Sequence, residues 1–111
     1  MSVNEKIEQA IGELFSGNVW PLKCPHDSAL DIYAIYNPEI EEPGYYADDA
    51  DEDWAQHMQI HAFTKGNYIG MRKEARKKLR ENGFIITGIY TNYEKETGYN
   101  HLCIECYTEE E

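Results

Sequence analysis

The stretch DWAQHMQIHAFTK, at Asp53–Lys65, decides much of the fold because apolar and polar side chains alternate along it. A period of two is typical of a strand that is buried on one face. The face expected on the core carries Trp54, Met58, Ile60 and Ala62, and the opposite face carries His57, Gln59, His61 and Phe63. The stretch therefore predicts a half-buried strand.

A helix is predicted immediately after this strand. Asn67 is a good N-cap residue because its side chain accepts hydrogen bonds from the first unpaired N–H groups of a helix. Gly83 suits the left-handed conformation that commonly follows the last helical turn. Between them lies one apolar stripe at helical spacing, formed by Tyr68, Met71, Ala75 and Leu79.

Two further strands are predicted after the helix, joined by a turn at Thr97-Gly98. The first is FIITGIYTNYEKE, which begins at Phe84, and the second is YNHLCIECYT, which ends at Thr108. The second strand again alternates. One face carries Leu102, Ile104 and Cys106, and the other carries His101, Cys103, Glu105 and Tyr107. The region from residue 53 onward therefore predicts a β-α-β-β core.

The N-terminal third predicts one helix and two strands. Apolar residues at helical spacing over residues 3–15 predict an amphipathic helix that is stopped by Gly17. Residues 18–23 predict an edge or irregular strand, because Pro21 cannot donate to a ladder. Residues 30–36 are rich in β-branched and aromatic side chains and predict a strand that ends at Asn37-Pro38, since the residue before proline is restricted.

The chain is strongly acidic, with a formal net charge of −11 at pH 7. Phosphate contacts need clustered lysine and arginine, so this balance argues against broad binding of bare DNA or of an anionic membrane. No stretch approaches the roughly 18 consecutive apolar residues of a membrane helix, and the start of the chain has no apolar signal region. We expect a soluble intracellular protein with no specific nucleic-acid partner and no membrane partner.

Acidic residues are concentrated in one segment, 38–53, in which Pro43-Gly44 is a turn signal. We expect an exposed acidic hairpin loop there. The candidates within it for contact with a basic surface are Asp48, Asp49 and Asp51. Residues 108–111 predict a short acidic tail.

The predicted central helix carries the opposite charge. It holds six of the ten basic residues of the chain, namely Arg72, Lys73, Arg76, Lys77, Lys78 and Arg80. One interpretation is a solvated helix face with pairs four residues apart, such as Glu74 with Lys78. The other is contact with the acidic segment of a neighbouring copy, for which the candidates are Arg72, Arg76, Lys77 and Arg80. Two different, complementary patches favour a head-to-tail contact, which closes into a ring or continues as a filament.

The cysteines predict no metal or redox site. Cys103 and Cys106 form a CxxC, but a separation of three in a strand points the two thiols to opposite faces. We expect one buried and one exposed cysteine. Three cysteines in all, with Cys24, do not suggest a secreted disulfide framework, so we expect reduced thiols.

The histidines and carboxylates predict no active site. His57 and His61 share a strand face at a spacing of about 13 Å, which is too far for one metal ion. Carboxylates near His101 are available from Glu94, Glu96 and Glu105, and such charge pairs are common on hairpin faces. The chain has no GxSxG, glycine-rich phosphate loop or HExxH motif. We therefore expect no enzyme activity, no cofactor and no bound metal.

Two stretches carry a resemblance to a known family. They are the strand pattern W-x-x-x-x-Q-I-H-x-F at Trp54–Phe63 and the pattern Y-E-x-E-T-G-x-x-H-L at Tyr93–Leu102. With the N-terminal helix, the short NVWPLKCP segment and the basic helix ending RENGF, the chain resembles the small tail-assembly proteins of tailed bacteriophages and prophages. These form the tail terminator or tail completion group, also called minor capsid or head-tail joining proteins. The likeness covers nearly the whole chain.

The resemblance implies an α+β fold in which two helices pack on one mixed, mostly antiparallel sheet of four to five strands, in a single domain over residues 1–111. Family members form rings, commonly hexamers, that cap the tail tube and provide the surface to which the filled head docks. The implied partners are copies of the chain itself, the tail tube protein and the head–tail connector protein. The implied location is the virion or the host bacterial cytoplasm.

Three alternatives stay open at this point. The first is a head-closure or connector-type head-tail joining protein. The second is an acidic DNA-mimic inhibitor, which the acidic segment favours and the clustered basic helix disfavours. The third is a small thiol or zinc protein that uses Cys24, Cys103 and Cys106.

Overall fold

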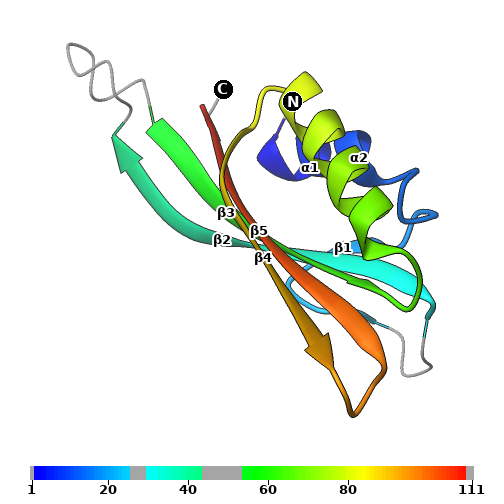
Figure 1. The fold of residues 1–111 in the computed structure, drawn as a ribbon. Helices are drawn as coiled ribbons and strands as arrows, with labels where there is room; N and C mark the ends of the chain where they lie inside the picture. The colour runs from blue at the N-terminus through cyan, green and yellow to red at the C-terminus, as the bar shows by residue number, and fades with distance from the viewer. Residues whose placement is uncertain (1, 26–29, 44–53, 110–111) are drawn as a thin grey trace.

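The computed structural model describes residues 2–25, 30–43 and 54–109, which form two helices and one five-stranded sheet (Figure 1). In chain order the elements are α1 (Val3–Ile11), β1 (Val19–Pro21), β2 (Ile32–Pro43), β3 (Trp54–Thr64), α2 (Tyr68–Glu81), β4 (Ile85–Glu94) and β5 (Tyr99–Glu109). The predicted α+β class and the β-α-β-β core are confirmed. Neither helix in these residues is long and apolar enough to cross a membrane.

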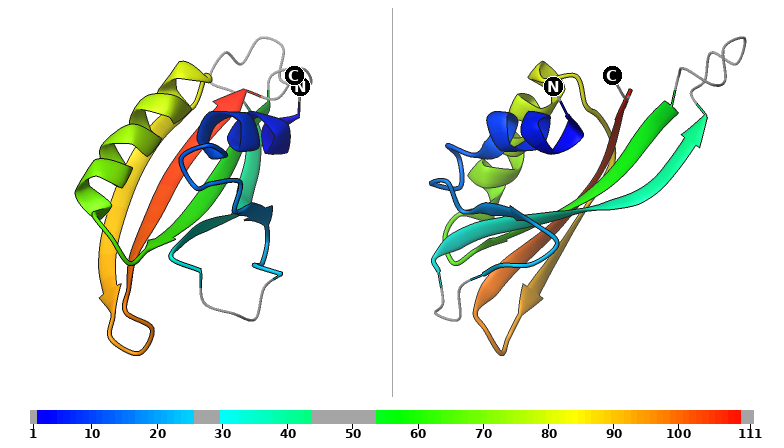
Figure 2. Two further views of the ribbon diagram at one scale, coloured as in Figure 1. Left: turned by 90° about the vertical axis from the view of Figure 1, so that its right-hand side faces the viewer. Right: turned by 180° about the vertical axis from the view of Figure 1, so that it is seen from behind.

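The sheet has the strand order β1-β2-β3-β5-β4. The short β1 pairs in parallel with β2, and every other neighbouring pair is antiparallel. Both helices cover the same face of the sheet, as the turned views of Figure 2 show. The other face, which we call the open face, is covered by no helix of the described residues, and β4 forms one edge of the sheet.

The core lies between the helices and the inner face of β3 and β5. Alternation along both strands is as predicted, because one set of side chains is buried while most of the intervening residues are only half-buried. The buried set includes Met58, Ile60, Ala62, Leu102, Ile104 and Cys106. The helices bring Ile7, Ile11, Met71, Ala75 and Leu79 into the same cluster. Each isoleucine, leucine or methionine among them contributes about 1.5–3 kcal/mol on burial, so this layer supplies most of the stabilisation.

The first helix is shorter than predicted. It ends at Ile11 with Gly12 as C-cap, and turns carry the chain through residue 17. Glycine is a weak helix former, and Ser16 and Gly17 then take left-handed conformations with φ of 56° and 79°. These turns redirect the chain toward β1 while Phe15, at 0% exposure, still reaches the core. The prediction of a helix over 3–15 was therefore wrong in its last turn.

The second strand is longer than predicted. It does not end at Asn37-Pro38 but continues to Pro43, with an irregularity between Pro38 and Ile40. Its parallel partner β1 ends opposite Tyr36, so β2 is beyond that point an edge strand. An edge strand tolerates proline because a missing N–H there breaks no ladder, and a bulge absorbs the irregular spacing. The predicted loop over 38–53 is therefore wrong for residues 38–43, and the rest of it lies outside the described residues.

The predicted ends of α2 are confirmed. The side-chain oxygen of Asn67 accepts hydrogen bonds from the backbone N–H groups of Ile69, at 3.0 Å, and Gly70, at 3.4 Å. Gly83 has a φ of 91°, just after the C-cap residue Asn82. The chain therefore turns directly from the helix into β4, and α2 comes to lie beside this edge strand.

Candidate assembly surface between α2 and β4

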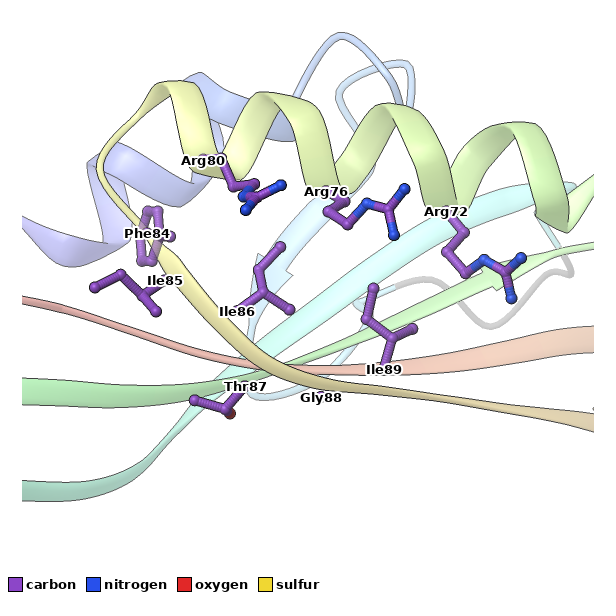
Figure 3. A pocket seen from close by; sticks show the side chains of 9 residues that line it. All are labelled: Arg72, Arg76, Arg80, Phe84, Ile85, Ile86, Thr87, Gly88 and Ile89. Carbon is purple, nitrogen blue, oxygen red and sulfur yellow. The ribbon is translucent and has the colours of Figure 1, made fainter.

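Three arginines form a stripe along one side of α2. Met71, Ala75 and Leu79 are buried and fix which side of the helix faces the sheet. Each arginine follows one of these residues by one position and is therefore rotated by about 100° around the helix axis. Figure 3 shows the three side chains, Arg72, Arg76 and Arg80, on the flank of the helix that borders β4.

The arginine stripe forms one wall of a groove of about 700 Å³, which we call the arginine groove. Its floor is formed by Phe84 and the first half of β4, as far as Ile89. Ile86 and Ile89 both point toward the helix (Figure 3). They share a face because the pairing with β5 shifts between Ile86 and Gly88, which leaves Thr87 as an extra residue. The groove thus combines an apolar floor with a cationic wall.

The charge on this surface is not neutralised by the rest of the described chain. Arg76 and Arg80 are exposed, and Arg72 is half-buried with its guanidinium carbon 6.0 Å from the ring centroid of Tyr68. None of the three forms an ion pair of 4 Å or less with a carboxylate of the described residues. Lys77 lies further round the helix and lines a neighbouring hollow with Lys73. The basic surface is therefore wider than the groove alone.

The predicted interface residues are thus brought together in part. The arginines of the groove lie in one row, and Lys77 lies beside them on the outer side of α2. Asp48, Asp49 and Asp51 lie outside the described residues. The alternative of a helix face tied by Glu74 and Lys78 gains no support, since these residues form no ion pair within the part of the chain that the structure describes.

Chemically, this surface is suited to holding carboxylates. A guanidinium group binds a carboxylate through two parallel hydrogen bonds, and such charge-assisted contacts are stronger than neutral ones. The apolar floor and the adjacent edge strand favour a polypeptide over a small anion, because they offer contact area beyond the charge. The surface is therefore a candidate for docking an acidic segment of protein.

The open face of the sheet carries a second cluster, built from aromatic and imidazole rings. Phe63 stacks between Tyr33, at 4.6 Å, and His101, at 4.4 Å between ring centroids. His61 Nδ1 lies 2.9 Å from His101 Nε2. Burial and the neighbouring His101 lower the pKa of His61. The contact expected between His101 and a carboxylate on the hairpin face is present, with Glu94 Oε2 3.4 Å from His101 Nδ1.

The two cysteines of the CxxC lie on opposite faces, as predicted. Cys106 is 1% exposed on the helix-covered face, and Cys103 is half-buried on the open face. Within the described residues, no three His, Cys, Asp or Glu side chains converge into a group that could hold a metal ion.

The floor of the arginine groove was not predicted from the sequence. Residues 84–96 predict a regular strand, in which Ile86 and Ile89 would face opposite sides. The signal for the bulge is Gly88, because an isolated glycine within a strand pattern often marks one. The proximity of His61 and His101 was missed as well, because it depends on the register between β3 and β5.

Comparison with known proteins finds a similar fold but no similar sequence. No family model matches the chain, and no curated protein matches its sequence. A chain of a solved structure described as "Virion of native gene transfer agent (GTA) particle" superposes with a TM-score of 0.64, over 98% of this chain and 94% of that chain. This protein has the fold of a virion chain. The two sequences are 9% identical, so the likeness is one of fold.

Proposed function

We propose that this protein is a structural component of a phage or prophage virion, a ring-forming tail terminator that caps the tail tube and helps to join the tail to the head. The observation that carries the proposal is the fold shared with a virion chain over nearly the full length of both. The two stretches that resemble the tail terminator group, at 54–63 and 93–102, lie in β3 and across the β4–β5 turn. The fold supports a virion structural role, and the sequence resemblance supports the narrower assignment to the tail terminator group.

The mechanism proposed is one of geometry rather than turnover. The arginine groove of one copy takes the acidic segment of the next copy, around Asp48, Asp49 and Asp51. Because the two surfaces differ, the contact is head-to-tail, and a rotation that closes gives a ring. Charge complementarity sets the register of such a contact more than its affinity. One face of the ring then stops addition of tail tube protein, and the other meets the head–tail connector protein.

The proposal is tested by the native mass of the purified chain, measured by light scattering over a range of protein and salt concentrations, with negative-stain images of the same samples. We expect closed rings, or a monomer that converts to rings as concentration rises or when isolated tail tubes are added. Rising salt should weaken assembly, because it screens exposed charges. A strict monomer that binds neither itself nor tail tubes contradicts the terminator function.

Two double charge-reversal variants test whether ring formation depends on the arginine groove. Arg76→Glu with Arg80→Glu should abolish rings, whereas Lys23→Glu with Lys95→Glu should leave them intact. Both pairs change the net charge equally, and Lys23 and Lys95 are exposed residues outside the groove. Equal loss in the two double variants would show that total charge, and not the groove, controls assembly.

A further inference from the structure

Two histidines from different strands converge on the open face of the sheet, away from the arginine groove. Phe63 of β3 pairs with His101 of β5, and His61 pairs with Cys103, so His61 and His101 are diagonal neighbours. Diagonal neighbours on adjacent strands are within reach of long and aromatic side chains. Their rings turn toward each other until His61 Nδ1 and His101 Nε2 are 2.9 Å apart.

The ring of His101 is held in this orientation from two sides. Phe63 stacks on it with 20° between the ring planes. Glu94 Oε2 lies 3.4 Å from Nδ1, on the opposite side of the ring from His61. A carboxylate there favours a proton on Nδ1 and leaves the lone pair of Nε2 directed at His61. Histidines that bind metal ions almost always donate their other ring N–H to a carboxylate, a backbone carbonyl or a water molecule, and Glu94 is in the position to accept it here.

We infer that His61 and His101 form a binding site for a divalent transition-metal ion of the nickel, copper and zinc group. Imidazole nitrogen suits these ions. Metal–nitrogen bonds of about 2.0–2.1 Å at a right angle place two ligand nitrogens about 2.9 Å apart. The two nitrogens already have the separation of neighbouring ligands. At 2.9 Å they share one hydrogen bond, so binding an ion requires the donating ring to move its proton to its other nitrogen, which frees both lone pairs.

The site has two protein ligands, and water completes the coordination. Within the described residues, no third His, Cys, Asp or Glu side chain joins the two histidines. A bound ion ties β3 to β5 on the face that the helices leave open. It therefore stabilises the folded chain, and the stabilisation grows with the logarithm of the free ion concentration above the dissociation constant, because the ion binds only the folded state.

The test is calorimetric titration of the full chain, without a histidine tag, with Ni²⁺. Nickel is preferred to copper as the probe because copper(II) oxidises thiols and the chain has three cysteines. We expect one ion per chain and a higher melting temperature. His61→Phe and His101→Phe should each weaken binding at least about tenfold, since each removes a ligand, and Glu94→Gln should weaken it by about tenfold.

His57→Phe is the matched control. His57 lies on the same face of β3, four positions from His61, where it stacks on Tyr107 at 5.1 Å. A phenyl ring keeps that stacking, and Ni²⁺ binding should be unchanged. Uptake of no Ni²⁺ by the unmodified chain would overturn the inference, as would an equal loss in His57→Phe and His61→Phe.

A second readout needs no variant. In proton spectra of the unmodified chain, substoichiometric Ni²⁺ should broaden the ring signals of His61 and His101 before those of His57. Broadening of all histidine signals together would overturn the inference, because it indicates scattered surface binding.

Discussion

Ile85 and Ile86 are neighbours in β4 that face opposite sides of the sheet. Ile85 is 54% exposed, whereas Ile86 is half-buried against the core and points toward α2 (Figure 3). Both residues are isoleucines in the same strand, so they have the same strand propensity. A comparison of the two therefore isolates the contribution that the groove floor makes to stability.

Truncation of these two isoleucines should have unequal effects on stability. Ile86→Ala should lower the free energy of unfolding by about 2 kcal/mol, since it removes apolar contacts beneath the helix. Ile85→Ala should lower it by only about 0.5 kcal/mol, as is usual for exposed positions. Urea unfolding of the two variants measures both values. Equal losses would contradict the placement of Ile86 between α2 and the sheet.

Tyr36 should make the protein sensitive to alkaline pH. Burial raises its pKa above the ordinary value, as does the 2.8 Å hydrogen bond that its hydroxyl donates to Glu8 Oε2. The folded state keeps this proton where an unfolded tyrosine, with a pKa near 10, has released it. The stabilisation is therefore complete below about pH 10 and is lost as the pH rises above that value.

The variant Tyr36→Phe tests this pH dependence. At pH 7 it should lower the free energy of unfolding by about 1 kcal/mol, the typical value of one hydrogen bond. Above pH 10 its stability should fall less steeply than that of the unmodified chain, with the remaining slope due in part to Tyr33, whose pKa burial also raises. Tyr90→Phe, at an exposed position, should keep the full slope. Parallel pH profiles for the two variants would contradict the role of Tyr36.

Gly83 should be costly to replace. Its φ of 91° lies in the left-handed region, which costs other residues about 1–2 kcal/mol. We expect Gly83→Ala to lower the free energy of unfolding by about 1 kcal/mol and Gly83→Asn to lower it by less, because asparagine tolerates this region. Thermal unfolding measures the difference. Two variants with the same stability would show that backbone conformation is not the cause.

The thiols should react at different rates. Cys106 is buried beneath the helices, whereas Cys24 and Cys103 are half-buried. We expect Cys24 and Cys103 to react with a chromogenic thiol reagent in the native protein and Cys106 to react only on unfolding. Mild oxidation should give no bond between Cys103 and Cys106, because they lie on opposite faces. Mass spectrometry that detects this bond in the native protein would contradict the placement of the two thiols on opposite faces of β5.

The parts of the fold that local periodicity specifies could be predicted from the sequence. Alternation around Ile60 and Ile104 gave the buried faces of β3 and β5, because side-chain direction in a strand depends only on position parity. Asn67 predicts the start of α2 because its side chain accepts hydrogen bonds from the first helical N–H groups. Gly83 predicts the end because its backbone tolerates the left-handed conformation. These features need no knowledge of the rest of the chain.

The parts that depend on neighbouring elements were predicted less well. Pro38 predicts the end of the strand from local preference alone. In the structure β2 continues, because among the described residues no strand pairs with its outer edge beyond Tyr36. Gly17 predicts the end of the first helix, but the helix ends at Ile11 with Gly12 as its C-cap. Both errors lie at the end of an element. The end of β2 depends on its neighbours in the sheet, whereas the early end of α1 follows from the weak helix propensity of Gly12.

The candidate site likewise has a part that local spacing predicts and a part that depends on how the strands pair. The sequence predicts Arg72, Arg76, Lys77 and Arg80 together on one helix. The structure places the three arginines along the groove and Lys77 beside them. The floor beneath them was not predicted, because the bulge at Thr87 depends on how β4 pairs with β5. The pairing of Phe63 with His101 likewise depends on strand register, which the sequence pattern alone does not specify to one residue.

A charge swap across the proposed contact tests the central claim most directly, with the native mass from light scattering as the readout. Arg76→Glu/Arg80→Glu alone and Asp48→Lys/Asp49→Lys/Asp51→Lys alone should each remain unassembled under conditions in which the unmodified chain forms rings. All five substitutions in one chain restore opposite charges across the contact, and we predict that rings return. The variant with all five substitutions must fold and melt like the unmodified chain. If it does so and still stays unassembled, the contact between the arginine groove and the acidic segment is contradicted.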